Sequence, residues 1–221
     1  MHAGCLSFEM SDGPDRMIVN CGSASNINIQ NNQAIGSIAR STAAHTTLSI
    51  NDTSSSRFLP EQKYKHLAGV PVLSGPKNIQ FERSHNQDHS MVTAEHDGYV
   101  PHFNVRHRRE IWLGSGGTTL TGRDTLLDGN GDTITKDNRH TFQLRFHLDS
   151  SIAAQASSSH TVDIKLASGQ RWLFTCENHL VELTDTINIS DVYGTKPAFQ
   201  ILLHGPLSKA SILDWTFQRL S

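Results

Sequence analysis

Histidine is the residue type in this sequence best suited to chemistry. The chain has thirteen of them, and an imidazole can serve as a general acid, a general base or a metal ligand near neutral pH. No pair has the HExxH spacing or the spacing of a zinc finger, so no local motif predicts a metal site. Any histidine site must therefore be assembled from positions that are far apart in the sequence.

A run of cationic residues, Arg106, His107, Arg108 and Arg109, is the second candidate. It could bind an anionic ligand, and the alternative is a solvated strand face. The formal net charge of the whole chain is −2, and no basic stripe is present of the kind that neutralises nucleic-acid phosphates. We therefore expect no nucleic-acid partner, and any recognition of an anionic polymer must come from this local cluster.

Three cysteines, Cys5, Cys21 and Cys176, form no CxxC pair. The odd count argues against a secreted disulfide framework and favours reduced, buried thiols.

No basic segment followed by an apolar one opens the chain, so we expect no signal peptide and a cytoplasmic location, although a longer parent could be periplasmic. No apolar run approaches the roughly 20 residues of a membrane span, and no membrane contact is expected.

The elements that must position these side chains are strands. Apolar and polar residues alternate with period two along most of the chain, and a helical period is scarce. Residues 6–10 and 16–20 predict a hairpin around a Gly-containing turn. The further predicted strands are 47–51, 91–95, 103–113, 118–127, 140–148, 161–166, 171–176, 180–189, 198–204 and 212–220. About a dozen short strands with turn signals between them predict an all-β fold, an antiparallel β-sandwich.

Two regions depart from this regular pattern. Residues 52–90 contain Pro60, Pro71 and Pro76, and we expect a functional loop or a segment that wraps across the sandwich. The alternation of 103–113 slips around 107–109, which predicts a β-bulge there. No internal repeat or composition boundary divides the chain, so residues 1–221 are expected to form a single β-sandwich domain.

Three separated blocks carry a family resemblance. They are His2–Met10 (HAGCLSFEM), Met17–Gly22 (MIVNCG) and Arg40–Leu48 (RSTAAHTTL). In order and spacing they resemble the heparinase II/III family, whose members have H-x-D-x-x-S-F-E-L, then a strand ending in D-x-G, then R-S-T-x-A-H-N-T. The segments His96–Tyr99 and His107–Arg109 fit the continuation of that pattern.

The resemblance implies a larger parent protein. Full-length members have an N-terminal (α/α) toroid and a C-terminal β-sandwich, and most are polysaccharide lyases acting on uronate-containing glycans. This chain begins inside the sandwich half, so we expect it to be the C-terminal part of a longer protein, with the helical domain and an anionic polysaccharide as partners. In the family most catalytic groups lie on the toroid, and Tyr64, Tyr99 and Tyr193 match no catalytic tyrosine motif. Whether the chain alone is an enzyme stays open.

The resemblance also implies site residues. A sandwich histidine of the family faces the cleft, and His45 is the expected catalytic residue. Arg106 to Arg109 are the expected substrate-binding residues. Relatives can hold zinc through residues that correspond to His2, Asn20 and His45. Gly4 replaces an aspartate of the pattern and Asn20 replaces the anionic ligand, so the cofactor is either none or zinc, and the alternative is a metal-free set of hydrogen bonds.

Three functions are compatible with these observations. The first is the sandwich domain of a lyase, which supports the cleft and docks the helical domain. The second is a non-catalytic carbohydrate-binding or scaffold module, which would expose at least two of Trp112, Trp172 and Trp215 on one face. The third is a zinc-dependent hydrolase, suggested by the histidine count. A sandwich without its partner domain should also expose an apolar face, and we expect a homo-oligomer.

Overall fold

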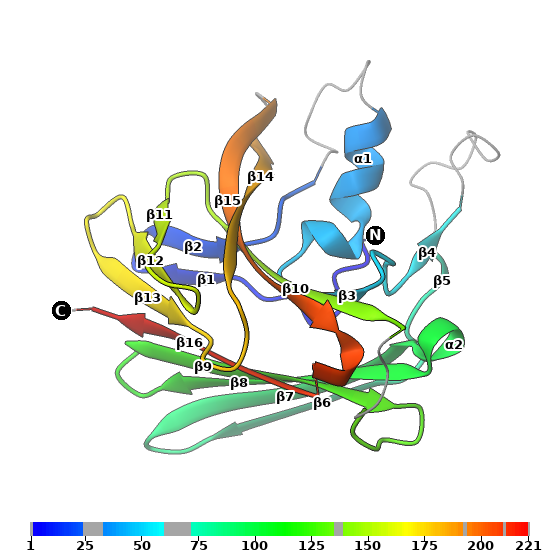
Figure 1. Ribbon diagram of the computed structural model, residues 1–221. Helices are drawn as coiled ribbons and strands as arrows, with labels where there is room; N and C mark the ends of the chain where they lie inside the picture. Colours follow the sequence, from blue (N-terminus) through cyan, green and yellow to red (C-terminus); the bar gives the residue numbers. More distant parts are fainter. Residues whose placement is uncertain are drawn as a thin grey trace.

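The computed structural model describes residues 2–23, 33–59, 72–134, 139–191, 194–209 and 211–220. Within these ranges the chain folds as two large β-sheets packed face to face, with a short helix and loops above one of them (Figure 1). Within each sheet the neighbouring strands run antiparallel. The prediction of an all-β antiparallel sandwich is confirmed.

The first sheet has six strands in the order β1-β2-β10-β15-β14, and β3 also pairs with β10. Its strands are β1 (Met10–Asp12), β2 (Asp15–Val19), β3 (Leu48–Ile50), β10 (Thr141–Leu148), β14 (Glu182–Asp191) and β15 (Gly194–Pro206). The predicted hairpin is present as β1 and β2, but its first strand begins at Met10 rather than at residue 6. The preceding residues lie outside the sheet, and Leu6 among them adopts a left-handed conformation, with φ of 59°.

The second sheet has eight strands in the order β11-β12-β13-β16-β9-β8-β7-β6. Its strands are β6 (Ile79–His85), β7 (His89–Tyr99), β8 (Val105–Gly114), β9 (Thr119–Asp128), β11 (Ala153–Ala156), β12 (Thr161–Lys165), β13 (Arg171–Thr175) and β16 (Ile212–Arg219). A separate pair consists of β4 (Arg57–Phe58) and β5 (Val72–Ser74).

Helices are short and few in the described parts of the chain. They are α1 (Gln33–Arg40), α2 (Val100–Phe103) and two 3-10 turns, Thr42–Ala44 and Leu207–Lys209. The helix α1 was not predicted, and Phe103 belongs to α2 rather than to the following strand. None of the described helices is long and apolar enough to cross a membrane.

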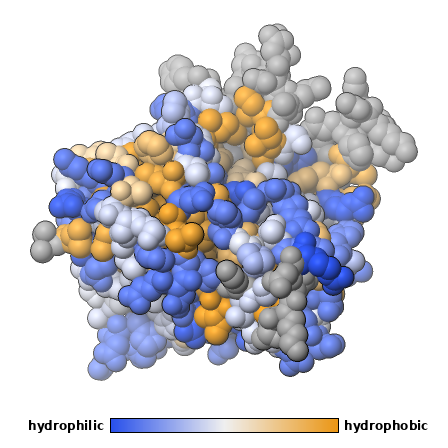
Figure 2. Space-filling view, in the orientation of Figure 1, coloured by the Kyte–Doolittle hydropathy of each residue, from blue (hydrophilic) through white to orange (hydrophobic). Residues whose placement is uncertain are grey.

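The core lies between the two sheets. Phe146 of β10 contacts Trp215 and Phe217 of β16, with ring centroids 4.8 and 5.6 Å apart, and Phe8 stacks on Trp215 at 5.7 Å. Alternate residues of the central strands face inward, which explains the period-two pattern of the sequence. In Figure 2 hydrophilic residues cover most of the lower part, where the eight-stranded sheet lies, and hydrophobic residues gather higher up.

Residues 52–90 are more regular than expected. The strands β4, β5 and β6 all lie in this stretch, and β6 extends the eight-stranded sheet at its edge. The expectation of a largely irregular loop is therefore wrong for its described parts. Pro60 and Pro71, on which that expectation partly relied, lie outside the described residues.

Candidate functional site

The histidines His2 and His45 form the polar end of the candidate site. His45 directly follows the 3-10 turn and is buried. Its Nδ1–H donates to the carbonyl oxygen of Ser41 at 2.7 Å, which leaves the lone pair on Nε2. The Nδ1 atom of His2 lies 3.2 Å from that Nε2. Burial lowers the pKa of both imidazoles, so His45 is neutral near pH 7 and its Nε2 can accept a proton or a hydrogen bond.

Gly4 lies against the ring of His45. A Cβ atom at position 4 would overlap the imidazole carbons of His45. An aspartate here, as in the family pattern, would have to displace that ring. The glycine therefore allows His45 to occupy space that a side chain at position 4 would take.

Asn20 does not complete a ligand set with the two histidines. Its Oδ1 accepts a hydrogen bond from the Thr46 amide at 3.0 Å, and its Nδ2 donates to Glu9 at 3.1 Å. The Asn20 oxygen, which would take the place of the anionic zinc ligand, is therefore already hydrogen-bonded to the backbone next to His45.

The predicted zinc site does not fit these residues. Zinc sites in proteins use three or four thiolate, imidazole or carboxylate ligands. The described part of the chain has no group of three or more His, Cys, Asp or Glu side chains able to hold a metal. His2 and His45 are brought together as predicted, but only as a hydrogen-bonded pair.

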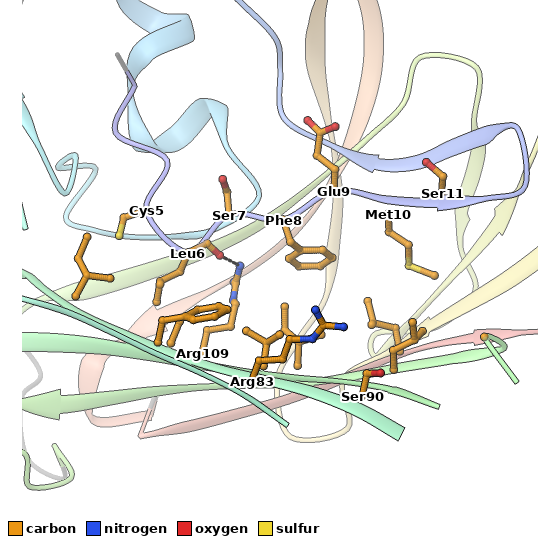
Figure 3. A pocket seen from close by; sticks show the side chains of 18 residues that line it. Cys5, Leu6, Ser7, Phe8, Glu9, Met10, Ser11, Arg83, Ser90 and Arg109 are labelled. Atoms are coloured by element: carbon orange, nitrogen blue, oxygen red, sulfur yellow. Dashed lines mark hydrogen bonds between the residues drawn. The ribbon is translucent and has the colours of Figure 1, made fainter. Parts of the chain in front are cut away.

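A groove extends from this pair along the inner side of the eight-stranded sheet. The end near His45 has a volume of about 450 Å³, and it shares the lining residues Cys5, Ser7 and Ile79 with a larger, mainly apolar part of about 930 Å³. Figure 3 shows Phe8 pointing from the N-terminal segment toward the sheet, whereas Ser7 points away. From the opposite side, Arg83 of β6 reaches into the same space.

The backbone of β8 runs through the predicted cationic cluster without interruption. Its pairing with β7 and β9 is continuous across 107–109, so the predicted bulge is wrong. The register shift lies on β7 instead, between His96 and Tyr99. The alternation of β8 is preserved because His107 and Arg109, although polar, occupy inward-facing positions and are buried.

The two outward-facing residues of the cluster form an ionic group with Glu95. Arg106 lies 3.3 Å from the Glu95 carboxylate and Arg108 lies 2.7 Å from it. The arginine side chains are 33% and 42% exposed, whereas that of Glu95 is only 8% exposed. The four residues therefore do not form one solvated face, and only these two arginines face solvent.

The two inward-facing residues meet at Asp124 of β9. Its carboxylate accepts hydrogen bonds from His107 Nε2 at 2.5 Å, from Arg109 Nε at 2.8 Å and from Trp215 Nε1 at 2.8 Å. Burial alone would raise the pKa of Asp124, but Arg109 and His107 outweigh it and hold that pKa well below its usual range. Burial lowers the pKa of His107. The group is thus an arginine–carboxylate pair beside a neutral histidine.

This buried group connects to the candidate site through Arg109. Its Nη1 donates to the carbonyl oxygens of Leu6 and Thr46, both at 2.8 Å. One guanidinium therefore ties the segment that lines the groove to the segment that carries His45. Sequence reasoning missed Asp124 as its partner. The available signal was an acidic residue and two cationic ones at inward-facing positions of neighbouring strands.

A second buried histidine, His147, lies on the outer side of the six-stranded sheet. Its Nε2 donates to the Ala43 carbonyl at 2.9 Å, and its Nδ1 lies 3.3 Å from the Cys21 sulfur. Burial raises the pKa of Cys21 to about 11 and lowers the pKa of His147 to about 4. Both groups are neutral near pH 7, so this pair is not an activated nucleophile. The prediction of reduced, buried thiols is confirmed for Cys21 and Cys176.

The three tryptophans, all within the described residues, do not form the exposed sugar-stacking platform that a binding module was expected to show. Trp172 and Trp215 are buried, and Trp112 is only partly exposed. Tyr99 is buried and donates to the Leu48 carbonyl. The other two tyrosines, at positions 64 and 193, lie outside the described residues.

The fold and the site define the chain as an antiparallel β-sandwich in which a buried Arg–Asp–His group holds a histidine-bearing segment beside a groove. The sequence profile of the family described as heparinase II/III-like, C-terminal, matches residues 1–216. The chain therefore belongs to this family, and the predicted resemblance is confirmed.

Solved structures of heparinases have the same fold. The heparan sulfate lyase HepC from Pedobacter heparinus has a TM-score of 0.71 at 9% identity, over 100% of this chain and 31% of that protein. Two heparinase III structures have TM-scores of 0.71 and 0.67 at 11% and 12% identity, each over 99% of this chain and 30% of theirs. The chain thus spans less than a third of the length of these lyases. No curated protein sequence matches it.

Proposed function

We propose that this chain is the C-terminal β-sandwich of a polysaccharide lyase that acts on uronate-containing glycans, and that it supports the cleft and docks an N-terminal helical domain. Membership of the heparinase II/III-like family supports this proposal, as does the likeness to three lyase structures of about three times the length. The single observation that carries it in the structure is the neutral His45, which lines one end of a groove and whose Nε2 lies 3.2 Å from Nδ1 of His2.

The reaction is a β-elimination. A base removes the proton at C5 of the uronate, the bond between C4 and the glycosidic oxygen breaks, a C4–C5 double bond forms, and an acid protonates the departing oxygen. His45 would contribute at Nε2, because Ser41 keeps the proton on Nδ1. Arg109 and Asp124 would act as positioning residues by fixing the backbone next to His45. No step requires a metal, and we propose that the site works without one.

Recognition of the anionic glycan remains a proposal for two of the four predicted residues. Arg106 and Arg108 keep exposed guanidinium groups, and an anionic chain would compete with Glu95 for them. They project from the outer face of the sheet, whereas the groove lies on the inner face. His107 is buried beneath the sheet surface, whereas Arg109, although buried, lines the groove on the inner face.

The test is lyase activity of the full-length parent protein on uronate glycans, followed by the ultraviolet absorbance of the unsaturated product. We expect His45→Gln to lower the rate by about 10²- to 10⁴-fold, the usual contribution of a general acid or base. His204→Gln, at an exposed histidine of β15, is the matched control and should keep full activity. Wild-type activity in the His45 variant would refute the catalytic role, and lyase activity of the isolated chain would refute the need for a helical domain.

A further inference from the structure

The strand β6 is an open edge of the eight-stranded sheet. Among the described strands it pairs only with β7, and all seven of its residues are exposed. Its pairing with β7 runs from Ile79 to His85 without a register shift. Protein sheets usually blunt such edges with bulges, prolines or charges, because the free N–H and C=O groups can pair with another chain. Here the edge carries the charged residues Glu82 and Arg83, but neither a bulge nor a proline interrupts it.

The side chains of β6 make this edge partly hydrophobic. Ile79 and Phe81 are 58% and 68% exposed and face the groove side of the sheet together with Arg83. Gln80 and Glu82 line a smaller hollow on the opposite face. The β6–β7 hairpin lies at the lower border of the molecule in Figure 1, away from the six-stranded sheet.

We propose that two copies of this chain associate through β6, as an antiparallel strand pair with Phe81 opposite Phe81 of the second copy. Two-fold symmetry about an axis normal to the sheet places one residue opposite its own copy, and opposed side chains share a face. An axis at Glu82 or at Arg83 would oppose two like charges. An axis at Gln80 would place Lys77 opposite Arg83.

Only an axis at Phe81 among these four avoids like charges in direct opposition. It places Ile79 opposite Arg83 and Gln80 opposite Glu82, and it brings together two phenylalanine rings that are each 68% exposed in a single copy. Each Arg83 then lies diagonal to the ring of Phe81 of the other copy, within reach of a cation–π contact. The two eight-stranded sheets would become one continuous sheet, and the exposed apolar surface at the border would be covered.

The test combines light scattering with disulfide trapping of the purified chain. Opposed residues of an antiparallel pair have Cα atoms about 4.5–5.5 Å apart, which suits a disulfide. We expect the wild type to have the mass of a dimer and Phe81→Cys to form a cross-linked dimer on oxidation. Glu82→Cys is the matched control, since in this register position 82 opposes Gln80, and it should remain uncross-linked. Oxidised wild type controls for Cys5, Cys21 and Cys176.

A second variant tests the energetics. Phe81→Asp places two carboxylates in direct opposition, and we expect the dissociation constant to rise at least about tenfold. Because Phe81 is exposed within one copy, the thermal midpoint of a dilute, monomeric sample should stay unchanged. A wild-type monomer at about 100 μM, a concentration at which a micromolar dimer would form, overturns the proposal. So does a Phe81→Asp dimer, or cross-linking of Glu82→Cys that equals that of Phe81→Cys.

Discussion

Acid should unfold this protein through histidines that are buried without charge. Burial lowers the pKa of His96 to about 3 and that of His147 to about 4, from 6.5 for an exposed histidine. The unfolded chain therefore takes up protons at about pH 6.5, whereas the folded chain does not until the pH is much lower. The stability that these two histidines contribute is fully present above pH 6.5 and is lost as the pH falls toward 4 and 3.

The magnitude follows from these values. Between pH 7 and pH 5 each histidine lowers the free energy of unfolding by about 2 kcal/mol, because the unfolded form becomes protonated and the folded form does not. His96 and His147 together account for about 4 kcal/mol, a large part of the typical 5–15 kcal/mol of a domain. The lowered pKa values of His107 and His45 act in the same direction.

Urea unfolding at a series of pH values measures the effect. In His147→Gln the amide can still donate toward the Ala43 carbonyl, which His147 now contacts at 2.9 Å, but the titrating group is gone. We expect the loss of stability between pH 7 and pH 5 to shrink by about 2 kcal/mol relative to the wild type. His204→Gln, at an exposed site paired with Glu182, should keep the wild-type dependence.

The substitution also lowers stability at every pH. The quantity to compare between the variant and the wild type is therefore the change in the free energy of unfolding between pH 7 and pH 5. If His147→Gln loses as much stability as the wild type between pH 7 and pH 5, then His147 already binds a proton in the folded state. That result would refute the reasoning from burial.

Three further predictions concern the core and the site. Asp124→Ala leaves the buried Arg109 without its carboxylate and should cost about 3–5 kcal/mol in urea unfolding, and a cost under about 1 kcal/mol would contradict this. Gly122→Ala would place a Cβ inside the ring of Trp215, and a loss of about 1–3 kcal/mol in the same assay is expected. If zinc does not bind beside His45, excess zinc should leave the thermal midpoint unchanged. If zinc did bind, free zinc at 100 times its dissociation constant would instead add about 2.7 kcal/mol to the free energy of unfolding.

Much of the fold was predictable because most strands bury one face. The period-two pattern of residues such as Phe142, Leu144 and Phe146 is a local signal, and it located most of the strands to within a few residues. The strands β4, β5, β6 and β11 and the helices α1 and α2 escaped it. The helix α1 has only eight residues, including Gly36, and β6 is exposed on both faces, so neither carries the periodic apolar signal of a buried element.

The candidate site was predictable only in part. The family blocks suggested that His2 and His45 belong to one site, and the structure places the two imidazoles 3.2 Å apart. The same blocks suggested Asn20 as a ligand, yet its oxygen binds a backbone amide. A bulge was predicted at 107–109 because polar residues there occupy inward-facing positions. The sequence does not show that two of them, His107 and Arg109, pair with the buried Asp124 of a neighbouring strand.

The sequence by itself determined the class of fold and the family, because alternation and ordered motifs are properties of short segments. Only the tertiary structure decided what each polar residue does. Burial and contact depend on strands that are distant in the chain. Arg109 joins two backbone segments and pairs with Asp124 because β9 places that carboxylate beside it. The same packing keeps His45 neutral beside the groove and leaves the edge of β6 open.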